Sequence, residues 1–284
     1  MSLICRILSR LFSLLPLPAA RWLGRGFGRL LGGFSSRKRE IQQRISACLE
    51  CPPREARRIY WRMYACLGMT VVEFLRLPHM ADEELRDQLT FADPGRIPPH
   101  DTQFLLLVAH TGNWEWLAAA TPLLTGFPLH VVVKELRPPS LNAWVLQARG
   151  RWGSRFIDRR GSAKTLLRIL KSGDPIGFVL DQNAKQNWGV FVDFFGQPAC
   201  TSDGLAQLAA LSGLPTLPVF CARQPDHRLQ IEIGEWIPPP PDRSEAAILA
   251  HTQACTQCIE EFIRRHPDQW IWMHRRWRTQ PLTA

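Results

Sequence analysis

A histidine and a glutamate at the junction of an apolar run and a helical run are well placed for acid–base chemistry. In the stretch VAHTGNWEWL the apolar run ends on His110, a short polar turn follows, and Glu115 lies between two tryptophans. A continuous helix would separate the two side chains by about 140° around its axis, whereas a strand, a turn and a helix can bring Glu115 back to the imidazole. A carboxylate bonded to one ring nitrogen fixes the tautomer and raises the basicity of the other. No serine or cysteine lies between the two residues, so the pattern predicts a dyad in which His110 is the general base for a substrate hydroxyl and Glu115 orients it.

The same letters would also suit a histidine that only ends a strand, followed by an acid favoured at a helix N-terminus. Three further segments favour chemistry. Arg159 and Arg160 follow the apolar FID, Asp181 and Gln182 follow the apolar FVL, and two prolines mark a strand entrance in GLPTLPVF. Ligands of open α/β sheets bind beyond the carboxyl ends of the strands. These residues are therefore expected in one crevice with His110.

The elements that must position these residues alternate along the chain. Hydrophobic periodicity predicts helices over 38–77, 113–124, 140–149, 162–172, 203–212 and 243–265. Continuous apolar runs predict strands over 103–110, 129–135, 155–158, 175–181, 190–196, 216–223 and 229–235. Apolar strands separated by helices are typical of a sheet covered on both faces. We expect the α/β class: a single domain with a mixed, largely parallel sheet flanked by helices, plus an N-terminal helical segment.

The predicted N-terminal segment, residues 1–40, is basic and amphipathic. Positions 1–39 hold eight lysines and arginines and no acid, so most of the net charge of +10 lies there. The longest apolar run is about half the ~20 residues that a transmembrane helix needs, and Pro16 and Pro18 interrupt it. A segment lying in the membrane interface fits this pattern; a signal peptide and an ordinary helical hairpin packed on the domain stay open. Residues 41–284 form the predicted catalytic domain, with a helical entry (41–90) and an α/β core (100–284).

Composition restricts the remaining possibilities. Hydrophobic content of 45% and charged content of 21% are those of a globular chain. The eight cysteines include two CxxC pairs, Cys48/Cys51 and Cys255/Cys258. A zinc site would suit such pairs, but each pair lies in or near an amphipathic helix, where cysteine packs as a small hydrophobe. We expect no bound metal, and a reducing compartment.

The order of the segments resembles the four-block signature of the glycerolipid acyltransferase superfamily. The sequence is still more similar to the lipid A biosynthesis acyltransferases, the lauroyl and myristoyl transferases. That resemblance rests on HTGNWEW, FIDRRG, LDQN, the run FVDFFGQPACTSDGLAQLAALSGLPTLPVF and the terminal HPDQWIWMHRRWR, between about 103 and 278. The glycerol-3-phosphate branch has Glu-Gly-Thr-Arg where this chain has LDQN, which favours a lipid A-type acceptor.

The resemblance implies an O-acyltransferase. It would move an acyl chain from an acyl carrier protein thioester to a hydroxyl of a lipid A precursor, at the cytoplasmic face of the inner membrane, with no cofactor. Carried over by position, His110 is the base, Glu115 its orienting acid, Arg159 and Arg160 the phosphate or oxyanion ligands, and Asp181 a partner of Arg159 or the acceptor. The full set of expected substrate-binding residues is Asn113, Arg159, Arg160, Asp181 and Gln182.

Alternative functions stay open, and the first of them shares the same chemistry. The acceptor could be another membrane lipid, such as a lysophospholipid, an ornithine lipid or a glycosylated phosphoinositol. A non-catalytic protein binding membranes or nucleic acid would use the basic N-terminus, but no nucleic-acid recognition motif accompanies it, and we expect no nucleic-acid partner. A serine hydrolase is disfavoured because Gly-x-Ser-x-Gly is absent.

Overall fold

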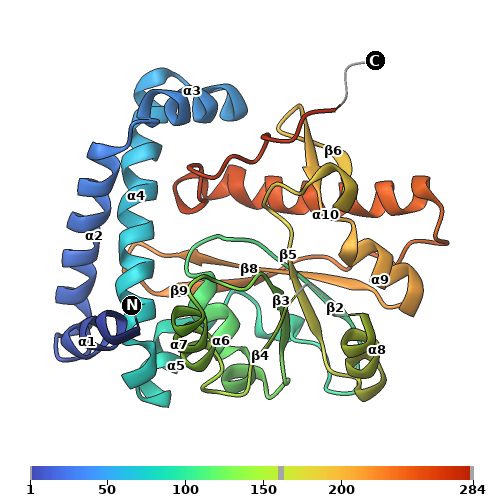
Figure 1. Ribbon diagram of the computed structural model, residues 1–284, viewed down its shortest axis with the longest axis horizontal. Coiled ribbons are helices and arrows are strands. Elements are labelled where there is room, and N and C mark those ends of the chain that lie inside the picture. Colours follow the sequence, from blue (N-terminus) through green and yellow to red (C-terminus); the bar gives the residue numbers. More distant parts are fainter. Residues whose placement is uncertain (1, 159–162, 282–284) are drawn as a thin grey trace.

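Seven strands form a mixed sheet in the order β1-β9-β8-β2-β5-β3-β4, with helices on both sides (Figure 1). The computed structural model describes residues 2–158 and 163–281. The strands of the sheet are β1 (Leu89–Phe91), β2 (Leu105–Val108), β3 (His130–Val133), β4 (Arg155–Asp158), β5 (Ile176–Val179), β8 (Thr216–Arg223) and β9 (Leu229–Ile233). Five neighbouring strands run parallel, and β9 pairs antiparallel with β8. The predicted mixed, largely parallel sheet is confirmed.

Five helices precede the sheet, and from β2 onward helices alternate with strands largely as expected. The helices are α1 (Ser2–Ser13), α2 (Leu17–Phe34), α3 (Lys38–Leu49), α4 (Pro53–Arg76), α5 (Asp82–Gln88), α6 (Trp114–Thr125), α7 (Pro139–Arg149), α8 (Ala163–Ser172), α9 (Gly204–Ser212) and α10 (Glu245–Arg265). The single helix predicted over 38–77 is wrong. Glu50 has left-handed backbone angles (φ 51°) after α3, and Pro52 and Pro53 cannot continue that helix because proline lacks the amide donor and restricts the preceding residue.

Sequence periodicity also missed two strands. The short edge strand β1 pairs with β9, and β7 (Gln197–Thr201) forms a separate antiparallel pair with β6 (Val190–Phe194). A three-residue strand such as β1 carries too little periodicity to detect. The segment of β7 does not resemble a strand because it contains Pro198, and proline is rare inside sheets. The extended segment predicted over 190–196 is confirmed as β6.

The two faces of the sheet bury alternate side chains against different helices. Leu105 and Leu107 of β2 belong to a core cluster that includes residues of α9 and α10. Leu106, between them, faces the opposite side and belongs to another cluster. On that opposite side α6 packs beside β8 (Figure 1). Because successive strand residues point to opposite faces, the continuous apolar runs of the sequence correspond to a sheet covered twice.

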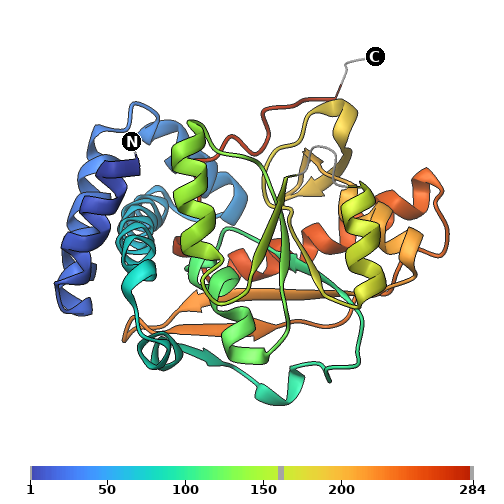
Figure 2. The same ribbon diagram turned by 60° about the horizontal axis from the view of Figure 1, so that its bottom comes forward.

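Helices α1 and α2 lie beside α4 at one end of the sheet (Figures 1 and 2). The contact between α2 and α4 is lined with glycine: Gly24, Gly28 and Gly32 are buried on α2, and a Cβ on Gly28 would overlap the carbonyl oxygen of Tyr64. Small residues let two helix backbones approach closely. The hydroxyl of Tyr60 on α4 donates to the carbonyl oxygen of Gly32 at 2.7 Å. The inward face of α2 is therefore its glycine face.

The bulky apolar residues of α1 and α2 face outward. Trp22 is 69% exposed and Phe34 is 82% exposed. The other exposed large apolar side chains of these two helices are Leu3, Ile4, Ile7, Leu8, Leu11, Leu23, Phe27, Leu30 and Leu31. No helix within the described residues is both long and apolar enough to cross a membrane. We call this surface the apolar face of α1 and α2.

Candidate active site

His110 lies in a tight turn between β2 and α6, at the carboxyl end of the parallel strands. Gly112 in this turn has φ +56°, and a Cβ there would overlap the carbonyl oxygen of Cys221 on β8. The position therefore favours glycine both for its backbone angle and for the close approach. The hydroxyl of Thr70 on α4 donates to the Gly112 carbonyl oxygen at 3.0 Å. Contacts with α4 and β8 therefore fix the position of this turn.

The carboxylate that holds His110 is Asp181, which follows β5. His110 Nδ1 lies 2.8 Å from Asp181 Oδ1. The indole Nε1–H of Trp270 donates to Asp181 Oδ2 at 2.8 Å. The Asp181 side chain has no exposed surface, whereas that of His110 is 22% exposed. With Nδ1 turned to Asp181, Nε2 of His110 is the ring nitrogen left for a substrate.

The expected hydrogen bond from Glu115 to His110 is absent from the described residues, and that part of the predicted dyad is wrong. Glu115 instead forms a two-pronged ion pair with Arg149 at the end of α7, with Nε–Oε2 and Nη2–Oε1 distances of 2.6 Å each. The indole of Trp114 also donates to Glu115 Oε1, at 3.1 Å. A bidentate guanidinium pair fixes a carboxylate in one orientation, so Glu115 is turned to Arg149. Glu115 nevertheless lines the same cavity as His110.

The charges around His110 set its basicity. Burial lowers the pKa of His110, but the charge of Asp181 and its hydrogen bond outweigh burial, and Glu115 adds to the rise. The net pKa of His110 is therefore above its ordinary value of 6.5. Burial raises the pKa of Asp181. The charge of His110 and the two side-chain hydrogen bonds lower this pKa by more than burial raises it, so the net pKa of Asp181 is below its ordinary value. The pair favours a charged carboxylate beside an imidazole that accepts a proton readily.

Asn113 has a structural position, and the prediction that it binds substrate is wrong. Its side chain is fully buried. Its Oδ1 accepts from the amide of Trp116 at 3.0 Å, which makes Asn113 the N-cap of α6. Its Nδ2 donates to Glu73 Oε2 at 2.7 Å. Both polar ends of the amide are thus used within the protein.

Glu73 of α4 joins this cap to two arginines. Its carboxylate accepts from Arg21 of α2 at 2.6 Å and from Arg223 of β8 at 2.5 Å. Burial raises the pKa of Glu73, but the charges and hydrogen bonds of the two arginines outweigh it and lower the net value. This buried cluster connects the outward-facing helix α2 to the turn that carries His110.

The remaining predicted residues divide into two groups. Gln182 is exposed, and its Nε2 lies 3.4 Å from both ring nitrogens of His110, so it borders the site as expected. Arg159 and Arg160 lie outside the described residues. They follow β4, which ends at Asp158.

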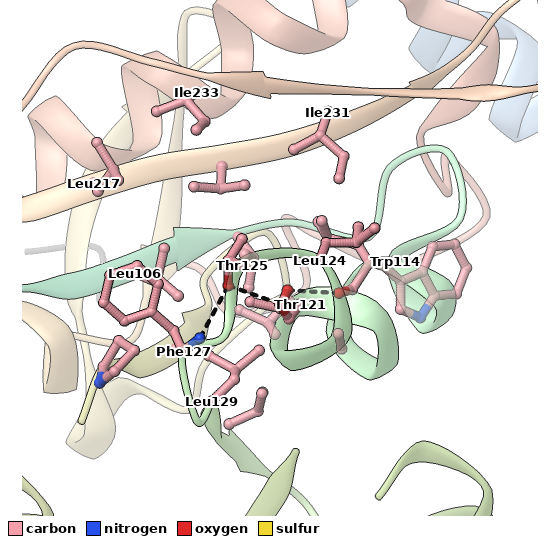
Figure 3. Close-up of a pocket in the computed structure, with 18 of the residues that line it drawn as sticks. Leu106, Trp114, Thr121, Leu124, Thr125, Phe127, Leu129, Leu217, Ile231 and Ile233 are labelled. Atoms are coloured by element: carbon pink, nitrogen blue, oxygen red, sulfur yellow. Dashed lines mark hydrogen bonds between the residues drawn. The ribbon is translucent and has the colours of Figure 1, made fainter. Parts of the chain in front are cut away.

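An apolar cavity opens beside His110 and extends along the face of the sheet that α6 covers. Its lining includes His110, Trp114, Glu115 and Arg149 near the carboxyl ends of the strands, and Phe104 and Phe127 near their amino ends. Figure 3 shows Leu106, Leu217, Ile231 and Ile233 of the sheet on one side and Thr121, Leu124 and Thr125 of α6 on the other.

Even the threonines of this lining offer little polarity. The hydroxyls of Thr121 and Thr125 donate to carbonyl oxygens of their own helix, each at 2.7 Å (Figure 3). At the far end the ring of Phe127 stacks on His100 and meets the edge of Phe104. Phe104 precedes β2 and His110 follows it, so the cavity runs the length of that strand. Its chemistry suits a hydrocarbon chain whose reactive end lies at His110.

Sequence reasoning missed three residues of this site: Glu73, Arg149 and Trp270. Each reaches the site from a distant part of the chain, 40, 34 and 89 residues from its polar partner. Trp270 lies in the block HPDQWIW, whose letters gave no sign that it bonds Asp181. No local spacing distinguishes Arg149 from any other arginine at a helix C-terminus.

The two CxxC pairs form no metal site in the described part of the chain. No group of three or more histidine, cysteine or acidic side chains is gathered there to hold a metal ion. Cys48 and Cys255 are buried in the core, and Cys51 and Cys258 pack against it. Burial raises the pKa of all four thiols. Thiols of this kind behave as small apolar side chains.

A strand-end histidine held by a buried acid, beside a cavity for an apolar chain, suits an enzyme that transfers acyl groups to hydroxyls. Comparison with known proteins supports this class of enzyme. The sequence-family model of the bacterial lipid A biosynthesis acyltransferases matches residues 2–279. The chain belongs to this family, and it is an O-acyltransferase acting on a membrane lipid.

Individual relatives share about a quarter of their residues with this chain. The lipid A biosynthesis palmitoleoyltransferase of Escherichia coli (strain K12) is 26% identical over 282 residues, covering 94% of this chain and 88% of that protein. The lauroyltransferase of the same strain is 26% identical with the same coverage. A phosphatidylinositol mannoside acyltransferase of Mycolicibacterium smegmatis is 26% identical over 77% of this chain and 68% of its own length.

Among solved structures, a 1-acyl-sn-glycerophosphate acyltransferase, PlsC, from Thermotoga maritima is similar with a TM-score of 0.40 and 14% identity. The match covers 92% of this chain and 97% of that one.

Proposed function

We propose that this protein transfers a fatty acyl chain from an acyl carrier protein thioester to a hydroxyl of a lipid A precursor. The observation that carries the proposal is the position of His110: Nδ1 is bonded to the buried Asp181, and the residue borders the apolar cavity. The lipid A names of several relatives support the acceptor. The acceptor, the donor and the roles of individual residues are parts of this proposal.

In the proposed reaction His110 Nε2 removes the proton of the acceptor hydroxyl as its oxygen attacks the thioester carbonyl. The tetrahedral intermediate collapses, the carbon–sulfur bond breaks, and the thiolate takes the proton from the imidazolium. An ester has formed and a thiol has left, so atoms and charge balance. Asp181 holds the ring and stabilises the imidazolium between the two steps. No protein nucleophile is required, because a thioester is already activated.

The role proposed for Glu115 follows from its partner. Held by Arg149, it adds negative charge near His110 and raises the pKa of the base without bonding it. The outer nitrogen of Arg149 not used in this pair, Nη1, is available to an anionic substrate group. Arg159 and Arg160 remain candidates for binding a phosphate or the developing oxyanion.

The proposed location is the cytoplasmic face of the inner membrane, with α1 and α2 lying on the surface. Support comes from the apolar face of α1 and α2, where Trp22 and Phe27 are exposed on a helix that also carries Arg25 and Arg29. Each basic residue near an anionic membrane adds about 1 kcal/mol of attraction. A lipid-linked hydroxyl would reach His110 from the bilayer, while the carrier-bound acyl chain arrives from the cytosol.

Purified protein tests the proposal directly. The purified protein is mixed with a lipid A precursor and with acyl carrier protein that carries a labelled acyl chain. Mass spectrometry then measures the mass of the lipid product. We expect a gain of one acyl group, lost in His110→Ala and retained in His130→Ala, a remote histidine bonded to Asp174 at 2.9 Å. Transfer from acyl coenzyme A alone would refute the carrier protein as donor. Full activity of His110→Ala would refute the base.

A second acceptor is favoured by a specific observation. Phosphatidylinositol mannoside acyltransferases are among the relatives at the same identity as the lipid A enzymes. The same reaction vessel supplied with a phosphatidylinositol mannoside decides between them: acylation of that lipid alone would assign the second acceptor and refute the first.

A further inference from the structure

A second concave site lies outside the catalytic cavity, between α1, α7 and the short helix η1 (Leu77–His79). Figure 1 shows α1 and α7 side by side below α4. The cavity has a volume of about 570 Å³. Its lining includes Arg6, Arg10, His79, Trp144, Gln147 and Arg151. Three arginines and a histidine therefore converge on one hollow without an acidic residue in its lining.

These arginines have no charged partner within the described residues. Arg6, Arg10 and Arg151 form no ion pair there, whereas many other arginines of the chain are paired. Arg151 donates one hydrogen bond to the carbonyl oxygen of Leu77 at 3.1 Å, which leaves most of its donors unused. Like charges gathered around one hollow repel one another, and a bound anion would relieve that repulsion.

The orientation of α1 explains why its arginines border the hollow while their side chains remain exposed. The buried hydroxyl of Ser9 donates to the carbonyl oxygen of Leu75 at 2.6 Å, which fixes which side of the helix meets the protein. Arg6, Ser9 and Arg10 are three and four residues apart and share that side. Ile4, Ile7 and Leu11 lie on the side of the helix opposite the buried Ser9 and are each at least half exposed. In a helix lying on a water-exposed surface the apolar side would face the protein.

This orientation of α1 determines the level of the hollow relative to a membrane surface. If the apolar side of α1 contacts lipid, its basic side lies at the level of the headgroups. Arginine binds phosphate oxygens with paired, charge-assisted hydrogen bonds. Trp144 and Gln147 complete a wall that suits an amphipathic headgroup. We propose that this hollow binds a phosphate group of a membrane lipid.

The last turn of α7 connects the hollow to the catalytic site. Gln147 and Ala148 line the hollow, and the next residue, Arg149, holds Glu115 and lines the catalytic cavity. A phosphate bound in the hollow would place a lipid beside the site where its hydroxyl reacts. The phosphate belongs either to the acceptor lipid, which rests on the proposed function, or to a phospholipid of the surrounding membrane.

A pair of double variants with equal loss of charge tests the proposal on the full chain. Arg10→Gln/Arg151→Gln removes two charges from the hollow. Arg29→Gln/Arg39→Gln removes two charges from exposed positions of the same basic region, outside the hollow. All four side chains are exposed, so both variants are expected to fold, and circular dichroism checks this. Any general loss of electrostatic attraction to membranes affects both variants alike.

Two measurements distinguish the sources of the phosphate. For a phosphate of the acceptor, the KM for a phosphorylated lipid A precursor rises about tenfold in Arg10→Gln/Arg151→Gln only, with kcat changed less than twofold, and the dephosphorylated precursor shows no such difference. For a phosphate of the membrane, Arg10→Gln/Arg151→Gln instead binds vesicles of four parts phosphatidylcholine and one part phosphatidylglycerol about tenfold more weakly than the control. Equal behaviour of the two variants in both measurements overturns the proposal.

The vesicle measurement does not depend on catalysis. If the wild-type protein acylates no lipid, the proposed function fails, and the vesicle measurement alone decides whether the hollow binds a lipid phosphate.

Discussion

His110 and Asp181 are separated by 71 residues in the chain, yet their side chains are 2.8 Å apart. The sequence indicated that both belong to one crevice, because each follows an apolar strand. It did not indicate which acid bonds the imidazole. Glu115 was the local choice because it is near in sequence, but Arg149 binds it instead. The partner of a charged side chain depends on which groups the fold brings together, and local spacing does not determine that.

Replacing Asp181 by asparagine tests the pair through the pH dependence of transfer. The proposed base must be unprotonated, so kcat/KM should rise as pH increases through the pKa of His110. Asp181 raises that pKa, and its neutral replacement should therefore move the rise to lower pH. The plateau rate should fall roughly 10²–10⁴-fold because the ring loses its orientation.

Two variants calibrate this measurement. Asp174→Asn removes the acid of a second histidine–aspartate pair, which lies at the amino ends of β3 and β5, at the opposite end of the strands from His110, and should leave rate and pH profile unchanged. Glu115→Gln should shift the profile in the same direction as Asp181→Asn, with a smaller loss of rate, because Glu115 acts on His110 by charge alone. A larger loss in Glu115→Gln than in Asp181→Asn would contradict the assigned roles.

At the scale of elements, apolar periodicity predicted most helices and strands but did not show which side of α2 packs inward. Large apolar residues normally mark the buried side of a helix. In α2 the buried side carries glycines, because the backbone of α4 lies too close for any larger side chain. The amphipathic pattern of residues 1–34 was therefore visible in the sequence, while its inverted orientation depended on packing.

Two glycines of α2 form a matched test of this contact. Gly28→Val should destabilise the protein by about 1–3 kcal/mol or more, because the new Cβ overlaps the carbonyl oxygen of Tyr64. Gly26→Val adds the same atoms where nothing lies within 4 Å, and it should be nearly neutral. Thermal unfolding measures both. Equal melting temperatures for the two variants would show that α2 does not pack on α4 in this way.

The aromatic end of the apolar cavity should limit acyl chain length. Phe127→Leu opens space at the end remote from His110, so we expect preference for donors longer than those of the wild type. Phe220→Leu truncates a buried phenylalanine that packs against Phe262 on the other face of the sheet. It should cost similar stability without changing the preference. Competition between carrier proteins with different acyl chains provides the measurement, and an unchanged preference in Phe127→Leu would contradict the assigned position of the chain.

At the scale of the whole molecule, the alternation of strands and helices was enough to predict an α/β fold with a mixed, largely parallel sheet. The pairing of β1 with β9 could not be predicted, since three residues carry no periodicity. The buried charge of Glu73 was equally hidden. A glutamate within a helix is normally predicted to be a surface residue. The burial of Glu73 is tolerated because the charges of Arg21 and Arg223 balance its own.

The apolar face of α1 and α2 should govern association with membranes. Trp22→Ser/Phe27→Ser removes two exposed rings without touching the glycine contact and should weaken binding to anionic vesicles about tenfold or more. Leu211→Ser/Leu249→Ser changes two exposed apolar residues on α9 and α10 and should bind as the wild type does. Co-sedimentation compares them. Undiminished binding of Trp22→Ser/Phe27→Ser would mean that another surface meets the membrane.

The central claim is that His110 directs an acyl chain to a lipid A precursor. Mass spectrometry of membrane lipids tests it in a bacterium that carries the gene, in a strain lacking it, and in that strain supplied with wild-type protein or His110→Asn. We expect lipid A of the deletion strain to lack one acyl group, and we expect the wild-type protein, but not His110→Asn, to restore it. An unchanged lipid A, or its restoration by His110→Asn, would contradict the account.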